Sequence, residues 1–128
     1  MPELPEELKY AATHEWSKVE NDTIVVVGIT EFAQEQLGDI VFLELPEPGT
    51  LVKAQQSCAV VESVKTASDL YSPVTGTVLE RNEKATDEPD TVNETPYETW
   101  LFKIKAETLT ELDELLDAEG YQSLIKDQ

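Results

Sequence analysis

The side chain best suited to chemistry in this chain is that of Lys65, which lies in a short polar segment between two apolar runs of β type. If the runs around Val61 and Leu70 pair as a hairpin, Lys65 lies at or beside its tip and faces water. An exposed tip suits covalent modification, because a modifying enzyme must reach the amine and an attached arm must swing freely. A lysine amine is normally protonated, so acylation needs proton removal or an activated acyl donor. The alternative interpretation is an ordinary solvated lysine.

The only cysteine and the only histidine offer little for catalysis. Cys58 begins an apolar run, where a free thiol usually behaves as a small buried hydrophobe, and a single cysteine forms no intramolecular disulfide. His14 is distant in sequence, has no metal-ligand spacing around it, and is interpreted as structural together with Trp16. An independent enzyme, such as a hydrolase using Cys58 or His14, is a disfavoured alternative, because no triad, metal cluster or glycine-rich phosphate loop is recognisable.

The composition favours one small acidic domain spanning residues 1–128. Lys and Arg number 9 against 27 Asp and Glu, which gives a net charge of −18. This charge argues against nucleic acid and anionic membranes as partners, because both attract basic surfaces. It indicates solubility, steering toward proteins with basic docking faces, or both. No apolar run approaches the roughly 18 residues of a membrane span, and residues 1–7 lack the features of a signal peptide, so we expect a cytoplasmic protein.

Short runs rich in β-branched and aromatic residues, separated by turn residues, predict a mainly β fold. Strands are expected at residues 23–27, 40–45, 51–52, 58–63, 70–71, 77–79 and 100–104. Asn21 and Asp22 predict a hairpin turn before the first of these runs. A short helix is expected at residues 31–37, with Thr30 as its N-cap and Gly38 as its C-terminal end.

The last third of the chain is more polar and then helical. Residues 81–99 include Pro89 and Pro96 and predict a surface loop. An amphipathic helix is expected next, because apolar residues recur at helical spacing at Leu109, Leu112, Leu115 and Leu116. Residues 108–111 have the capping-box form at its start, and Gly120 predicts a break before residues 121–126. The helical tail is therefore expected over about residues 108–126.

Several motifs, in the right order, resemble the H proteins of the glycine cleavage system. Residues 62–65, 67–69 and 72–76 resemble the lipoyl-attachment segment of that family, with Lys65 as the attachment lysine. The likeness extends over nearly the whole chain through residues 14–16, 28–34, 37–42, 44–46, Asn93, 96–97, Trp100 and 112–117. It implies a lipoyl/biotinyl-type hammerhead β-sandwich with a short internal helix and C-terminal helices.

The resemblance implies a non-catalytic carrier that bears lipoate covalently on Lys65. Its lipoyl arm would take the aminomethyl group of glycine from the P protein (glycine decarboxylase) and deliver it to the T protein (aminomethyltransferase). The L protein would then reoxidise the arm, whose dithiolane carries the redox chemistry. A lipoylating enzyme is a further expected partner, and the chain is expected to be a monomer. An alternative is an H-like relay that supplies lipoyl groups to 2-oxoacid dehydrogenase complexes.

Two other classes of carrier fit less well. Biotin carriers share a related fold, but their lysine usually lies between two methionines, whereas Lys65 lies between Val64 and Thr66. Phosphopantetheine carriers use a serine at a helix start in a helical bundle, which this β-rich pattern does not offer.

The resemblance also implies roles in lipoylation and docking. Glu62 and Gly76 match elements that the lipoylating enzyme recognises, although a solvated strand-edge carboxylate and an ordinary turn glycine would be simpler roles.

One departure from the family pattern concerns the loop before Trp100. The family usually has a glycine directly before this tryptophan, where this chain has Thr99. The loop of the family is also one residue longer. The conformation of this loop is therefore not carried over from the family.

A cleft in which the loaded arm rests is implied by four positions, Thr13, Glu15, Ile29 and Asp69. Carboxylates at such positions would attract the cationic aminomethyl amine. The alternative is plain surface charge together with one isoleucine of the core.

Overall fold

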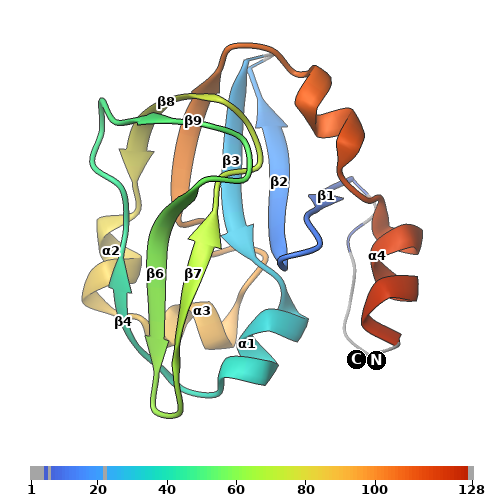
Figure 1. Ribbon diagram of the computed structural model, residues 1–128. Helices are drawn as coiled ribbons and strands as arrows, with labels where there is room; N and C mark the ends of the chain where they lie inside the picture. The colour runs from blue at the N-terminus through green and yellow to red at the C-terminus, as the bar shows by residue number, and fades with distance from the viewer. Residues whose placement is uncertain (1–4, 6, 22, 127–128) are drawn as a thin grey trace.

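The computed structural model describes residues 5, 7–21 and 23–126, and these form two antiparallel β-sheets that pack face to face (Figure 1). The larger sheet contains, in spatial order, β1 (Lys9–Tyr10), β2 (Glu15–Glu20), β3 (Ile24–Ile29), β9 (Phe102–Ala106), β8 (Gly76–Arg81) and β5 (Leu51–Val52). The smaller sheet contains β4 (Ile40–Glu44), β6 (Ser57–Ser63) and β7 (Ala67–Tyr71). The predicted mainly β sandwich is thus confirmed.

The main core lies between the two sheets. Because side chains alternate along a strand, every second residue of β3 points toward the smaller sheet, and Val25 and Val27 are fully buried there. Val61 of β6, Leu70 of β7 and Ile104 of β9 belong to the same cluster. The β-branched content of these runs therefore follows from their packing on pleated surfaces.

A second apolar cluster lies on the outer face of the larger sheet, under α4 (Ala118–Lys126) (Figure 1). Tyr121 of α4 stacks on Tyr10 of β1 with ring centroids 4.9 Å apart. Trp16 lies across Gly28 of the neighbouring strand, where an added Cβ would be 2.5 Å from the indole ring. Glycine is therefore required at position 28 for the ring to lie flat on the sheet.

The internal helix α1 (Glu31–Leu37) has the predicted bounds and caps. The Thr30 hydroxyl accepts a hydrogen bond from the Ala33 amide (3.1 Å), which satisfies one of the free amides of the first turn. Gly38 ends the helix with φ +81°, a conformation that favours glycine. The chain then turns directly into β4.

The prediction of a loop for residues 81–99 is wrong. The segment contains two short helices, α2 (Glu83–Asp87) and α3 (Asp90–Glu94). Asn82 caps α2 by accepting a hydrogen bond from the Ala85 amide (3.4 Å). Ala85 and Val92 are fully buried and attach the two helices to the main core. Each helix is only five residues long and buries a single apolar residue, so neither carries the repeated apolar spacing that identifies a helix in sequence.

The predicted C-terminal helix with a break at Gly120 is also wrong in its details. The segment contains a 3-10 helix, η1 (Thr110–Glu114), followed by α4. Between them Leu116 pairs with Tyr10 through two backbone hydrogen bonds of 2.7 and 2.8 Å, which interrupts the helical path. Gly120 lies inside the first turn of α4, where its amide donates to the Asp117 carboxylate (2.8 Å).

The predicted capping box at residues 108–111 does not form. Instead, the Glu111 carboxylate accepts hydrogen bonds from the Thr75 amide (2.7 Å) and the Thr75 hydroxyl (2.9 Å). A tertiary partner has therefore replaced the local one.

Two expectations fall partly outside the described residues, namely the acidic start at residues 1–7 and the turn at Asn21 and Asp22. Strands β1 and β2 were not predicted from the sequence. Across the described ranges, no helix combines the length and the apolar character needed to cross a membrane.

Candidate functional site

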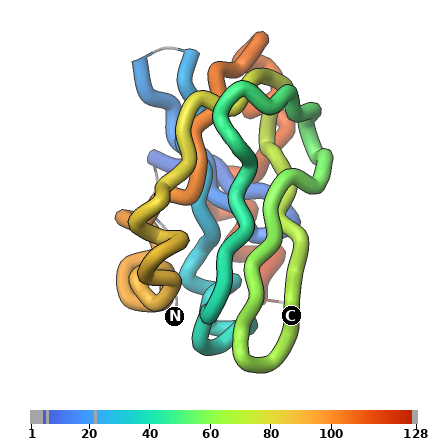
Figure 2. The backbone as a smooth tube through the Cα atoms, turned by 90° about the vertical axis from the view of Figure 1, so that its left-hand side faces the viewer, coloured from blue at the N-terminus to red at the C-terminus, as the bar shows by residue number. Residues whose placement is uncertain are grey.

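Lys65 lies at the tip of the β6–β7 hairpin, as predicted. The strands pair through Glu62 opposite Ala67, and the residues between them, 64–66, form the exposed tip. Figure 1 shows this hairpin extending past the end of the sandwich beside α1, and Figure 2 shows the same tip next to the turn between α1 and β4. The lysine is thus accessible to another macromolecule on a projecting element.

The side chain of Ser63 organises the backbone of this tip. Its hydroxyl oxygen accepts hydrogen bonds from the Lys65 and Thr66 amides, both at 3.1 Å. The hydroxyl also lies 3.2 Å from the Thr66 carbonyl, which accepts a further bond from the Ser63 amide (2.8 Å). Local side-chain bonds of this kind satisfy the amides of a tight turn. The backbone at Lys65 is therefore held in place while its side chain remains exposed.

The tip is also attached to the turn that follows α1. The Val64 amide donates to the Asp39 carbonyl (3.0 Å), and Ser63 pairs with Ile40 of β4. The Lys65 side chain runs close to Gly38, where an added Cβ would lie 3.2 Å from the lysine Cε. Gly38 therefore ends α1 and also leaves room for the aliphatic part of Lys65.

Carboxylates gather on the outer face of the smaller sheet, beside the lysine. Directly opposed residues share a face of a sheet, so the pairing of Phe42 with Glu62, and of Val60 with both Glu44 and Asp69, places these side chains together. Phe42 lies among the exposed residues Glu44, Glu62 and Asp69, and its side chain is itself 46% exposed. The face around Lys65 thus combines negative charge with an exposed aromatic ring.

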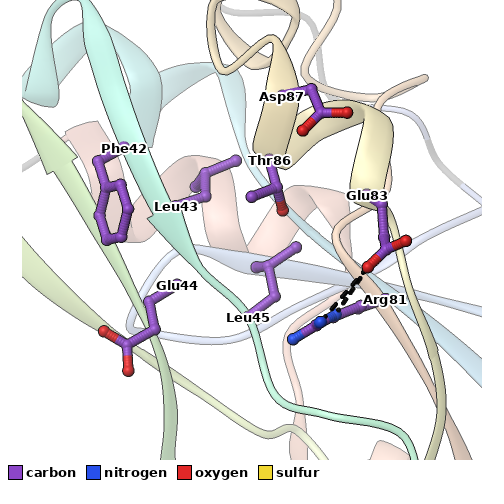
Figure 3. A pocket seen from close by; sticks show the side chains of 8 residues that line it. All are labelled: Phe42, Leu43, Glu44, Leu45, Arg81, Glu83, Thr86 and Asp87. Carbon is purple, nitrogen blue, oxygen red and sulfur yellow. Dashed lines mark hydrogen bonds and ion pairs between the residues drawn. The ribbon is translucent and has the colours of Figure 1, made fainter.

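A pocket of about 300 Å³ lies between β4 and α2 (Figure 3). Phe42 and Glu44 line its β4 side, and Asp87 lines its α2 side. Arg81 is the cation in its lining, but its guanidinium lies 3.3 Å from the Glu83 carboxylate. The pocket therefore adds to the acidic character of this side of the protein, and Lys65 is not part of its lining.

Gly76 is the first residue of β8 rather than a turn residue. It pairs with Ala106, and a Cβ added at Gly76 would lie 2.1 Å from the Lys105 carbonyl oxygen. The close approach of β8 to β9 therefore requires glycine at this position. Recognition of Gly76, or of the exposed Glu62, by a lipoylating enzyme stays a prediction.

Glu15 is fully buried at the start of β2. Its carboxylate accepts hydrogen bonds from the Thr13 hydroxyl and from the Tyr71 amide (3.0 Å). Burial raises the pKa of Glu15 to about 7, although both donors favour the ionised form. This carboxyl therefore changes its protonation near neutral pH.

A pocket of about 470 Å³ adjoins Glu15. Its lining comes from the turn before β2, the end of β7, the tail and neighbouring loops, and comprises Tyr10, Ala11, Ala12, Thr13, Glu15, Gln55, Tyr71, Ser72, Pro73, Glu114, Leu115, Leu116 and Leu124. Of the four positions expected to form a resting cleft, Thr13 and Glu15 line this pocket. Ile29 pairs with Glu15 in the sheet but is only 1% exposed in the core, and Asp69 lies on the exposed part of β7.

Cys58 and His14 occupy packing positions. Cys58 is half-buried against the main core, and burial, reinforced by the charge of Glu15, raises the pKa of its thiol to about 12. A thiol that stays protonated is a poor nucleophile. The His14 Nδ1 lies 2.7 Å from the Tyr121 hydroxyl, and its ring packs on Phe32 with centroids 5.0 Å apart.

The loop before Trp100 is ordered despite its departure from the family pattern. The Trp16 indole donates to the Pro96 carbonyl (3.0 Å), and the Glu31 amide donates to the Tyr97 hydroxyl (3.2 Å). The Thr99 hydroxyl donates to the Thr91 carbonyl (3.1 Å). These bonds connect the loop to β2, α1 and α3.

Comparison with known proteins places this arrangement in a family. The model of the glycine cleavage H-protein family matches residues 8–128. The chain belongs to this family. It is 56% identical over 128 residues to the glycine cleavage system H protein of Pectobacterium atrosepticum, covering 99% of this chain and 98% of that protein. It is 52% identical to the H protein of Methylococcus capsulatus, over 99% of this chain and all of that one.

The fold agrees with that of a solved H protein. The crystal structure of a glycine cleavage system H protein from Mycobacterium marinum superposes with a TM-score of 0.89 and 40% sequence identity. The match covers 96% of this chain and 99% of that one.

Sequence reasoning did not assign roles to Ser63 or Tyr71. A serine two residues before a turn lysine is a recognisable signal, because short hydroxyl side chains often bond nearby amides. The bond from the Tyr71 amide to Glu15 joins residues 56 positions apart and had no such signal.

Proposed function

We propose that this H protein carries lipoate on Lys65 and uses the lipoyl arm to move the aminomethyl group of glycine from the P protein to the T protein, with reoxidation by the L protein. H proteins are non-catalytic carriers, and the proposal adds the attachment residue and the route. The observation that carries it is the position of Lys65, exposed on a projecting hairpin whose backbone is held by Ser63.

The chemistry assigned to this chain is limited and specific. The lysine amine, once deprotonated, attacks the carbonyl carbon of an activated lipoyl donor; the bond from that carbon to the activating group breaks, this group leaves, and the amide that forms carries no positive charge. The rigid hairpin then fixes the root of the arm, while the dithiolane supplies the redox chemistry when it is present. The acidic face around the tip, with Glu62 beside it, supports recognition by partner enzymes with basic surfaces.

The pocket beside Glu15 is the proposed resting place of the loaded arm. Asp69 is four residues beyond Lys65, about 13 Å along an extended strand, and Tyr71 at the pocket lies further along the same strand. The Glu15 carboxylate, with Thr13 beside it, would stabilise the cationic amine at the end of the arm, because charges attract strongly where water is excluded. Asp69 would contribute at the exposed approach to the pocket.

The direct test is the mass of the intact protein after expression with lipoate, followed by peptide mapping. We expect one lipoyl group, on the peptide that contains Lys65, and none in Lys65→Arg, which keeps the charge but offers no acylation nucleophile. Lys53→Arg is the matched control, because Lys53 is also exposed but lies outside the hairpin. Lipoyl label on Lys53 or Lys84 of the unsubstituted protein would contradict the assignment.

Carrier function is tested with the P protein. The lipoylated chain alone is expected to show no glycine exchange, and addition of the P protein should start it. A lipoylated chain that leaves the P protein inactive, but delivers lipoyl groups to a 2-oxoacid dehydrogenase, would favour the relay function instead.

A further inference from the structure

We propose that Asn93 is a positioning residue for the Lys65 tip: it holds the turn on which the tip rests. The inference deepens the proposed function, because it concerns how the modified lysine is presented to the lipoylating enzyme. Asn93 lies on α3, far from Lys65 in sequence. Its side chain bonds Gln34, Gly38 and Ile40, which are not part of the hairpin.

The side-chain amide of Asn93 bridges the turn between α1 and β4. Its Nδ2 donates to the Gly38 carbonyl (2.8 Å) and to the Gln34 Oε1 (2.9 Å), and its Oδ1 accepts from the Ile40 amide (2.9 Å). The orientation of the amide follows from its partners, because a backbone amide requires the oxygen and a backbone carbonyl requires the nitrogen. One amide hydrogen and the oxygen therefore bind the two ends of the turn, at Gly38 and Ile40, and the second amide hydrogen binds the side chain of Gln34 in α1.

The residue enclosed by this bridge is Asp39. Its neighbours Gly38 and Ile40 are both bound by Asn93, and its own carbonyl accepts the hydrogen bond from the Val64 amide (3.0 Å). Gly38 also lies against the aliphatic chain of Lys65. A displacement of this turn would therefore displace the support of the tip.

The base of the bridge is rigid because α3 is anchored in the core. Val92, directly before Asn93, is fully buried in the main cluster, and α3 packs against both α1 and β4. The path from the core to the tip thus runs through Val92, Asn93, the turn at Asp39 and Val64. Figures 1 and 2 both show the hairpin tip beside the turn that this path crosses.

Loss of the bridge should change presentation of the lysine rather than its reactivity. If the turn samples several positions, only a fraction of molecules presents the tip correctly, and the apparent affinity of the enzyme falls by that fraction. Once bound, the amine is unchanged. We therefore expect Asn93→Ala to raise KM for the chain as a lipoylation substrate about tenfold, with kcat nearly unchanged.

The experiment compares Asn93→Ala with Asn82→Ala in the full chain. Asn82 is the matched control, because it belongs to the same segment and, like Asn93, bonds a backbone carbonyl, that of Trp100 (2.7 Å). It caps α2 and does not touch the turn under the tip. Each variant is measured for global unfolding, for hydrogen exchange at the Val64 amide, and for KM and kcat with the lipoylating enzyme.

Asn93→Ala should accelerate exchange at the Val64 amide by about tenfold relative to Asn82→Ala at matched global stability, with the KM change described above. Equal exchange at Val64 in the two variants, or an unchanged KM in Asn93→Ala, would overturn the inference. If Asn93→Ala does not fold, Gln34→Ala decides, because it removes one partner of the amide and should give a smaller acceleration in the same direction. Hydrogen exchange needs no lipoate, so a misassigned attachment lysine would leave this readout intact.

Discussion

Replacement of Glu15 by glutamine should make the protein less sensitive to pH near neutrality. The buried carboxyl has its pKa raised from the ordinary 4.5 to about 7, so between these values the folded state binds a proton that the unfolded state has lost. The free energy of unfolding therefore falls as pH rises through this window, and the loss is complete above about pH 7. Below pH 4.5 the group is neutral in both states and costs nothing.

The size of the effect follows from the two pKa values. The difference between the two pKa values corresponds to about 3 kcal/mol in full, and most of it develops between pH 5 and pH 8. Glutamine can preserve the local bonds, because its oxygen can accept from the Tyr71 amide while its amide group donates to the Thr13 hydroxyl. The substitution therefore removes the titration without removing the packing.

The assay is denaturant unfolding of the protein without lipoate at several values from pH 5 to pH 8, above the isoelectric point near 4.1. Other titrating groups are common to both proteins, so the difference in unfolding free energy isolates Glu15. The unfolding free energy of Glu15→Gln should rise by about 2–3 kcal/mol relative to that of the unsubstituted protein from pH 5 to pH 8. Glu35→Gln, at an exposed position of α1, is the control. Its unfolding free energy should change between pH 5 and pH 8 in the same way as that of the unsubstituted protein. Parallel curves for Glu15→Gln would refute the reasoning.

Three further predictions concern the strand contact, the loaded arm and docking. Gly76→Ala should destabilise the fold by about 1–3 kcal/mol, because the new Cβ meets the Lys105 carbonyl, and thermal unfolding would show it; an unchanged midpoint would contradict the close approach. At pH 8, the aminomethylated arm, isolated from the T protein, should decay faster in Glu15→Gln than in Asp69→Asn, because an exposed ion pair contributes only about 0–1 kcal/mol; equal decay in both variants and the unsubstituted protein would mean plain surface charge. Association with the P and T proteins should slow as salt rises, because screening acts beyond roughly 8 Å at physiological ionic strength, and a rate independent of salt would limit the acidity to a role in solubility.

The elements that the sequence predicts well are those with local signals. A run of β-branched residues identifies β3, and the pair Thr30 and Gly38 marks both ends of α1. The hairpin around Lys65 is predicted because its two apolar runs flank a short polar segment. In each of these cases the sequence signal comes from residues that are close together in the chain.

The elements that it misses depend on distant partners. Glu111 has the spacing of a helix cap, yet it binds Thr75, because that contact satisfies two polar groups at once. The helices α2 and α3 bury one apolar residue each, so neither shows the repeated apolar spacing that predicts a helix. Likewise, only two of the four residues expected in the cleft line the pocket beside Glu15, because Ile29 is buried in the core and Asp69 lies on the exposed part of β7.

The stiffness of the hairpin tip has a consequence for how firmly the arm needs to be held. With the backbone fixed by Ser63, the far end of a tethered arm explores only the volume that its own bonds allow. A short flexible tether gives an effective concentration in the millimolar range, so a pocket with only millimolar intrinsic affinity would be substantially occupied. An enzyme that offers the arm a modestly better site can then withdraw it at little energetic cost. Weak binding in the pocket is therefore compatible both with shelter between partners and with rapid transfer at each of them.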